Sequence, residues 1–134
     1  MNNLYKNKEK PKILIIDDEP DITEMLAKIL SNNNYLPLIA NSSQEAISLA
    51  KKNKPLHVAL LDWFLPDIPG PKLIHHLKEQ SPHIEIIANT AIGKTSDIAK
   101  FMKAGASFYL DKPFDNINEL LSLLEQALKS SLKN

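Results

Sequence analysis

The sequence has no cysteine and no arginine among its 134 residues. Without cysteine there are no disulfides, thiolate metal sites or cysteine nucleophiles, so any chemistry has to come from carboxylates, lysines, hydroxyls or histidines. All 16 basic residues are lysines. A phosphate group would therefore meet a point charge and not the planar fork of a guanidinium.

A net charge and long apolar runs are also missing. The 16 basic residues are balanced by 16 acidic ones, which leaves no basic footprint for a nucleic-acid backbone, so we expect no direct nucleic-acid binding. The longest apolar runs, such as 13–16 and 58–61, have only the length of a strand, and the start of the chain has no apolar signal region. We expect a cytoplasmic protein without a membrane span.

A lysine-rich tail, residues 1–10, precedes a single predicted domain that covers residues 11–132. In this domain apolar runs of strand length alternate with stretches of helical period, which is typical of a parallel sheet covered by helices and predicts the α/β class. The predicted strands are residues 12–17, 35–40, 58–61, 84–88 and 107–110.

The stretches between the strands carry helix signals. Pro20 stands in the first turn of the first stretch, and Ser42-x-x-Glu45 forms a capping box before the second. The last helix is predicted from about 115 to 132. Apolar residues expected on the inner stripes are Ile22, Met25, Leu26, Ile29 and Leu30; Ile47, Leu49 and Ala50; Leu73, Ile74 and Leu77; Ile98, Phe101 and Met102; and Ile117, Leu120, Leu121, Leu124 and Leu128.

Acidic residues follow two of the predicted strands, Asp17-Asp18-Glu19 after the first and Asp62 after the third. Open parallel sheets bind ligands beyond the carboxyl ends of their strands, where the strand order reverses, and in the order 2-1-3-4-5 strands one and three are neighbours there. The same order puts strand two at an edge. That agrees with Pro37, which cannot donate to a ladder. We therefore expect three carboxylates in one crevice.

Clustered carboxylates repel one another unless a cation neutralises them. A cluster that offers only oxygen atoms suits Mg²⁺, which takes one or two carboxylates, keeps several waters and bridges to phosphate oxygens. Taken alone, Asp17 and Asp18 could equally serve the dipole of the following helix. In the company of Asp62 they indicate a magnesium site.

Four motifs in order, each at the end of a predicted strand, resemble the response-regulator receiver pattern from Pro11 onward. They are Asp17-Asp18, Asp62-x-x-x-Pro66-x-x-x-Gly70, Thr90-Ala91 and Lys112-Pro113-Phe114. The resemblance implies a flavodoxin-like (βα)5 three-layer sandwich with a five-stranded parallel sheet in the order 2-1-3-4-5. It also implies a signalling switch, not an enzyme, that assists its own phosphoryl transfer and autodephosphorylation.

By this resemblance Asp62 would accept a phosphoryl group from a histidine kinase or a histidine phosphotransfer protein. Asp18 would bind Mg²⁺ directly and Asp17 through water. Asp62 and the main-chain carbonyl of Phe64 would complete the ligand set. Lys112 would pair with Asp62 at rest and with a phosphoryl oxygen after transfer. The bond between Lys112 and Pro113 is expected to be cis.

Thr90 and Tyr109 match the family's switch pair. Thr90 would donate its hydroxyl to the phosphoryl group, and Tyr109 would then turn inward, although it could also be an ordinary core aromatic. The change would be displayed to a downstream effector protein or domain on the face of the fourth helix, fifth strand and fifth helix. Candidate contacts on that face are Phe101, Phe108 and Leu110. Without arginine for a salt-bridged dimer face, we expect a monomer or a weak dimer.

Two positions depart from the family pattern. Asn89 stands where an apolar residue usually precedes the threonine, and the bulky pair Trp63-Phe64 follows the expected nucleophile. We hypothesise that Phe64 hinders the attacking water and lengthens the phosphoryl lifetime. Surface or partly packed positions are the preferred interpretation of His57, His75, His76 and His83.

Other functions remain open. A receiver-like interaction module that is never phosphorylated would not need the acids, Thr90 and Lys112. The segment 88–95 misses a nucleotide-binding P-loop by one glycine, because Ala88 stands where the first glycine is required. A phosphatase with an aspartate nucleophile needs a second acid two residues further on, where this chain has Phe64.

Overall fold

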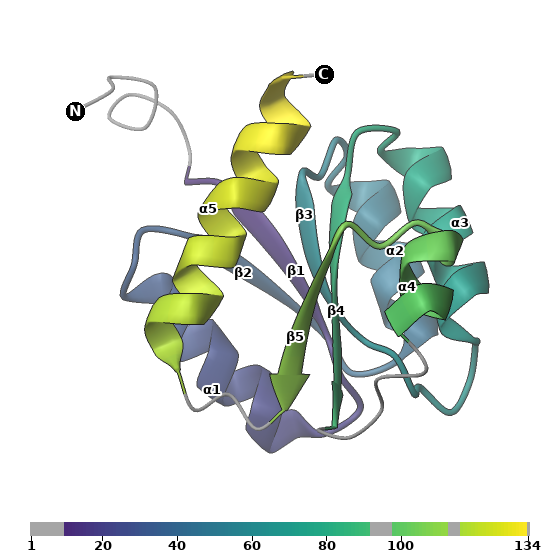
Figure 1. Cartoon of the computed structure of the whole chain (residues 1–134), viewed down its shortest axis with the longest axis horizontal. Helices are drawn as coiled ribbons and strands as arrows, with labels where there is room; N and C mark the ends of the chain where they lie inside the picture. Colours follow the sequence, from purple (N-terminus) through teal and green to yellow (C-terminus); the bar gives the residue numbers. More distant parts are fainter. Residues whose placement is uncertain (1–9, 92–97, 113–115, 134) are drawn as a thin grey trace.

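The computed structural model describes residues 10–91, 98–112 and 116–133, and for residues 90, 91 and 112 only the backbone (Figure 1). The strands are β1 Lys12–Ile16, β2 Leu36–Ala40, β3 Val58–Asp62, β4 Glu85–Ala91 and β5 Phe108–Lys112. The helices are α1 Pro20–Ser31, α2 Ser43–Lys52, α3 Gly70–Gln80, α4 Ile98–Ala104 and α5 Ile117–Lys133. None of the helices in these ranges is long and apolar enough to cross a membrane.

The strands form one parallel sheet in the order β2-β1-β3-β4-β5, which confirms the predicted flavodoxin-like topology. Helices α1 and α5 cover one face, and α2, α3 and α4 cover the other (Figure 1). Because both faces are covered, β3 is buried along its whole length. The core therefore consists of two apolar layers, one on each side of the sheet.

Pro37 lies in an edge strand, as predicted. The Leu36 amide donates to the Pro11 carbonyl at 2.9 Å, so the backbone N–H of Leu36 is directed toward the chain of β1. The backbone N–H groups of successive residues point alternately to the two sides of a strand within the plane of the sheet. The Pro37 nitrogen is therefore directed to the open edge, where no ladder bond is lost.

Helix α2 begins with the predicted cap, in a modified form. The Ser42 hydroxyl accepts from the Glu45 amide at 3.1 Å, but the Glu45 carboxylate accepts from the Asn41 amide, one residue before the capping-box position. Asp67, in the loop after β3, also accepts from the Ser43 and Gln44 amides. Burial tends to raise the pKa of Asp67, but these amides, the Ser43 hydroxyl and the Ile68 amide together lower it.

Each predicted strand differs from the structure by one residue or more at one end at least, and the last helix begins at Ile117 and not at about 115; three stripe positions differ as well. Strand β4 continues to Ala91 and β5 to Lys112, beyond the predicted ends at 88 and 110. The two strands keep pairing after the apolar pattern stops, with Thr90 opposite Asp111. Three residues predicted on inner stripes lie at the margins of those stripes and are exposed: Met25, Met102 and Ile117.

Candidate functional site

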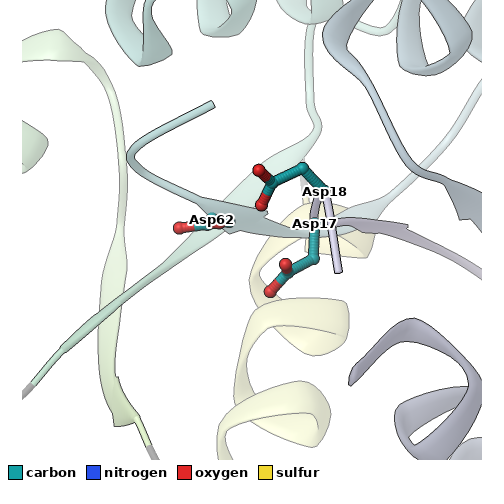
Figure 2. A group of neighbouring side chains, drawn as sticks. All are labelled: Asp17, Asp18 and Asp62. Carbon is teal, nitrogen blue, oxygen red and sulfur yellow. The ribbon is translucent and has the colours of Figure 1, made fainter. Parts of the chain in front are cut away.

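Three carboxylates meet at the carboxyl end of the sheet (Figure 2). Asp17 and Asp18 follow β1, Asp62 is the last residue of the neighbouring strand β3, and one oxygen from each lies within 4.8 Å of the others. Asp17 and Asp62 are buried, whereas Asp18 is exposed. The structure thus confirms the predicted convergence, because parallel strands end at the same edge of the sheet.

Backbone amides hold the two buried acids in place. The Glu19 amide donates to Asp17 Oδ1 at 3.0 Å, and the Phe64 amide donates to Asp62 Oδ1 at 3.3 Å. The main chain at Asp17 is fixed as well, since its carbonyl accepts from the Asn41 side-chain amide at 3.0 Å. These bonds tie each carboxylate to the loop that follows its strand.

The donor set fits magnesium. It offers carboxylate oxygens and no nitrogen or sulfur atom, which favours a hard cation such as Mg²⁺ over zinc or copper. Three acids within 4.8 Å also call for a positive charge to offset their repulsion. Receiver domains generally bind Mg²⁺ at an acidic cluster of this kind. That the main-chain carbonyl of Phe64 is also a ligand stays a prediction.

The two aromatic residues after Asp62 have opposite environments. Phe64 is 55% exposed, whereas Trp63 is buried. The Trp63 ring packs against Phe101 of α4 with their centroids 4.0 Å apart. It also lies over Gly70, where an added Cβ would come within 2.9 Å of Trp63 Cε3. The glycine at this position therefore leaves room for the indole.

Tyr109 continues this aromatic packing toward β5. Its ring stacks on Phe101 with their centroids 6.0 Å apart, and its hydroxyl donates to Asp111 Oδ1. The hydrogen bond to Asp111, followed by burial and the Asp111 charge, raises the pKa of Tyr109 to about 12. Trp63, Phe101 and Tyr109 thus form a continuous path from the residue after Asp62 to β5. The sequence pattern did not predict this path.

Thr90 and Lys112 lie at the ends of adjacent strands, with Thr90 opposite Asp111 and Ala91 opposite Lys112. The backbone therefore brings both positions to the carboxyl edge of the sheet, where the three acids lie. Their side chains, Pro113 with its predicted cis bond, and the P-loop-like residues 93–95 lie outside the described residues. The roles assigned to them stay predictions.

Two of the three candidate contacts for an effector were wrong. Phe101 is fully buried and Leu110 is 4% exposed, so neither offers a docking surface. Phe101 lies beneath Trp63 and Tyr109, and Leu110 belongs to the core under α1 and α5. Phe108 is half-buried and remains a candidate.

The histidines have the predicted surface or partly packed positions. His75 and His76 lie 3.8 and 3.6 Å from the Glu79 carboxylate on α3. His57 is half-buried at the opposite end of the sheet from the acids, with Nδ1 3.0 Å from the Ser131 hydroxyl.

Comparison with known proteins agrees with the geometry. The model of the response regulator receiver domain matches residues 13–125. PhoB, the phosphate regulon transcriptional regulatory protein, is 32% identical in Escherichia coli over 120 residues, which cover 88% of this chain and 52% of PhoB. PhoB of Pseudomonas aeruginosa is 38% identical over 119 residues, covering 87% and 51%. The chain thus spans about half the length of these relatives.

Solved structures show the same fold. A CheY-like receiver domain protein from Methanospirillum hungatei superposes with a TM-score of 0.83 at 28% identity, covering 92% of this chain and 98% of that one. The chemotaxis protein CheY4 of Vibrio cholerae gives 0.81 at 26% identity, covering 89% and 99%. The family match, the strand order and the acidic cluster agree, and the chain belongs to the response regulator receiver domains of two-component signalling, which pair with histidine kinases and effector domains.

Proposed function

We propose that this receiver domain is a phosphorylation switch in which Asp62 takes a phosphoryl group from a histidine kinase or a histidine phosphotransfer protein. The observation that carries the proposal is the meeting of Asp62 with Asp17 and Asp18 at the end of β3, inside a chain of the receiver family. Because Asp62 is 7% exposed and held by the Phe64 amide, its carboxylate is fixed before a donor arrives.

The transfer is a nucleophilic displacement. An oxygen of the ionised Asp62 carboxylate attacks the phosphorus of the phosphohistidine, so a P–O bond forms while the P–N bond breaks. The electron pair of the broken bond returns to the ring nitrogen, which leaves as neutral imidazole when the other ring nitrogen carries a proton. The product is an aspartyl phosphate, which water later hydrolyses to restore the carboxylate. The chain assists both steps but is not an enzyme acting on other molecules.

Asp17, Asp18 and Asp62, with the Phe64 carbonyl, are the groups that would hold Mg²⁺. When bound, the ion neutralises charge that develops on the transferring phosphoryl group. The remaining parts belong to the chain itself. The Glu19 and Phe64 amides orient the carboxylates, and Lys112 and Thr90 supply an ammonium and a hydroxyl to the phosphoryl oxygens.

The output would pass through Thr90 and Tyr109 to the face of α4, β5 and α5. The stacking of Tyr109 on Phe101, which also touches Trp63, supports this coupling because a shift beside Asp62 has a packed route to β5. On that face Met102 is 40% exposed and Phe108 half-buried. We propose that a downstream effector protein or domain binds there. We further propose a cytoplasmic domain, monomeric or weakly dimeric, that makes no direct nucleic-acid contact.

The test is phosphorylation by a small acyl phosphate in the presence of Mg²⁺, followed by intact-mass measurement. We expect wild-type protein to gain one phosphoryl group and Asp62→Asn to gain none, with a chelator preventing the gain in wild type. Glu24→Gln, which removes an exposed acid on α1, is the matched control and should behave as wild type. Wild type that never gains a phosphoryl group would favour the unphosphorylated interaction module, and equal labelling of Asp62→Asn would assign the acceptor to another residue.

A further inference from the structure

Asn89 is a buried polar side chain next to the site, with no role so far. It is 1% exposed, and within residues 10–91, 98–112 and 116–133 its Oδ1 atom has no hydrogen-bond partner. An unpaired buried acceptor is costly, and an apolar residue of the same shape would avoid that cost. A group kept at such a cost calls for a functional explanation.

The register places Asn89 directly beside the expected nucleophile. It lies opposite Asp62 of β3 on one side and Leu110 of β5 on the other, and its carbonyl accepts from the Trp63 amide at 3.0 Å. Its own strand neighbour two residues earlier, Ile87, belongs to the core under α1 and α5, as does Leu60 two residues before Asp62. Because residues two apart share a face of a strand, Asn89 and Asp62 share that face.

Among the residues whose side chains the structure describes, the two cross-strand neighbours of Asn89 offer no donor to its Oδ1 atom. An ionised Asp62 carboxylate only accepts hydrogen bonds, and Leu110 has no polar side-chain atom. Backbone amides in the interior of the sheet are already engaged in its ladders. The donor is therefore to be sought outside these described neighbours, and beside three carboxylates a cation is favoured over a neutral donor.

We propose that Asn89 is a positioning residue, whose Oδ1 accepts a hydrogen bond from the ammonium of Lys112. The inference rests on the proposed function, in which Lys112 serves Asp62 and then the phosphoryl group. An ammonium has three donors and no acceptor, so Asp62, a phosphoryl oxygen and Asn89 would occupy all three. The β5 backbone carries Lys112 two residues beyond Leu110, the cross-strand neighbour of Asn89.

The choice of an amide suits this task. An aspartate at position 89 would form an ion pair with the lysine and compete with Asp62, whereas an apolar residue would leave one ammonium donor without a protein partner. The neutral carbonyl of asparagine holds the ammonium without competing for its charge. Asn89 would thus fix where the charge lies while leaving it available to the phosphoryl oxygens.

The test is a double-mutant cycle on the rate of phosphorylation by the small acyl phosphate at saturating Mg²⁺. We expect Asn89→Leu to slow transfer about tenfold, the size of one lost hydrogen bond to a charged group. Asn89→Thr, which keeps an oxygen and suits a strand, should recover most of the rate. In a Lys112→Met background Asn89→Leu should cause no further loss, because its partner is already absent.

Three results would overturn the inference: an unchanged rate in Asn89→Leu, an equal slowing by Asn89→Leu with and without Lys112, or no recovery with Asn89→Thr. Each requires that wild type is phosphorylated. If wild type takes up no phosphoryl group, the proposed function itself has failed. Urea unfolding of Asn89→Leu checks that the variant is folded, and we expect a modest loss of stability because one ammonium donor of Lys112 loses its partner.

A second measurement applies even if Asn89→Leu does not fold. The side-chain amide resonances of Asn89 are followed by NMR in wild type and in Lys112→Met, both in the presence of Mg²⁺. We expect the loss of the ammonium to shift these resonances while those of a distant side chain, such as Gln126 on α5, stay in place. Identical Asn89 resonances in the two proteins would contradict the proposed bond.

Discussion

The buried and half-buried polar groups at the two ends of the sheet have different partners. At the carboxyl end Asp17 and Asp62 are buried beside each other, and the Oδ1 atom of Asn89 is unpaired within the described part of the chain. At the amino end the Ser131 hydroxyl donates to the His83 carbonyl at 2.6 Å and lies 3.0 Å from His57 Nδ1. Like-charged carboxylates therefore lie together at the carboxyl end, whereas hydrogen-bond donors and acceptors are paired at the amino end.

This difference separates stability from function. The Ser131 contacts join the C-terminal half of α5 to the residues that precede β3 and β4, so they fasten the last helix to the sheet. The acids at the other end repel one another and lower the stability of the metal-free fold. A site that must bind a cation and a phosphoryl group cannot be fully neutralised by the chain itself.

The largest expected effect is on the amino end. Ser131→Ala should lower the free energy of unfolding by about 2 kcal/mol, because it removes the partner of both the His83 carbonyl and the His57 ring. Urea unfolding followed by the fluorescence of Trp63, the one tryptophan of the chain, measures this loss. Phosphorylation of the folded variant should match wild type. Ser122→Ala, at an exposed position on α5, is the control, and an equal loss there would remove the special role of Ser131.

At the carboxyl end we expect a smaller change in the free energy of unfolding, and of opposite sign. Asp18→Asn should raise the free energy of unfolding in metal-free buffer by about 1 kcal/mol, because one of three neighbouring charges disappears. Mg²⁺ should stabilise wild type and fail to stabilise the variant. Thermal unfolding with and without Mg²⁺ measures both effects. If Glu24→Gln gave the same metal-free gain, net charge and not the cluster would be the cause.

The exposed aromatic beside the acids sets a kinetic expectation. Phe64→Asn should speed loss of the phosphoryl group from Asp62 by a few fold, because a smaller polar side chain admits water. This corresponds to a decrease of less than about 1 kcal/mol in the activation free energy of hydrolysis. Decay of the phosphorylated mass over time measures the rate. Phe64→Leu, which keeps an apolar side chain, should stay closer to wild type, and an unchanged rate in Phe64→Asn would refute the hypothesis.

The smallest effect concerns pH at the amino end. Burial, with a lesser effect of the nearby His83, lowers the pKa of His57 below its ordinary value of 6.5. The unfolded chain therefore binds more protons than the folded one as the pH falls below 6.5, so stability present above that value declines toward the lowered pKa. His57→Gln should flatten this decline, which is below about 1 kcal/mol. Ser122→Ala, which changes an exposed residue of α5 that does not titrate, should leave the slope unchanged.

Much of the site could be predicted from the sequence because it depends on strand order alone. Asp17 and Asp62 meet because they follow adjacent parallel strands. The burial of Trp63 also had a signal, since Ala59, Leu61 and Trp63 alternate onto one face and join one core cluster. Its contact with Gly70 had none, because it depends on how the loop after β3 closes.

The wrong predictions concern the burial or the strand pairing of individual residues. Leu110 was assigned to a surface from the family's signalling face, although its alternation in β5 directs it into the core with Leu60 and Ile87. The polar side chain of Asn89 argued against burial, although its alternation with the core residue Ile87 indicated it. Strand β4 continued past the point where its apolar run ended, because pairing with β5 depends on the backbone and not on hydropathy.

Pro37 bears on how copies of this domain can associate. A free sheet edge is a template for strands of other chains, and a proline whose nitrogen faces outward removes one donor from that template. Addition of a strand in regular register along β2 is therefore disfavoured. Growth of the sheet from one molecule to the next would have to begin at β5, the edge that belongs to the proposed signalling face.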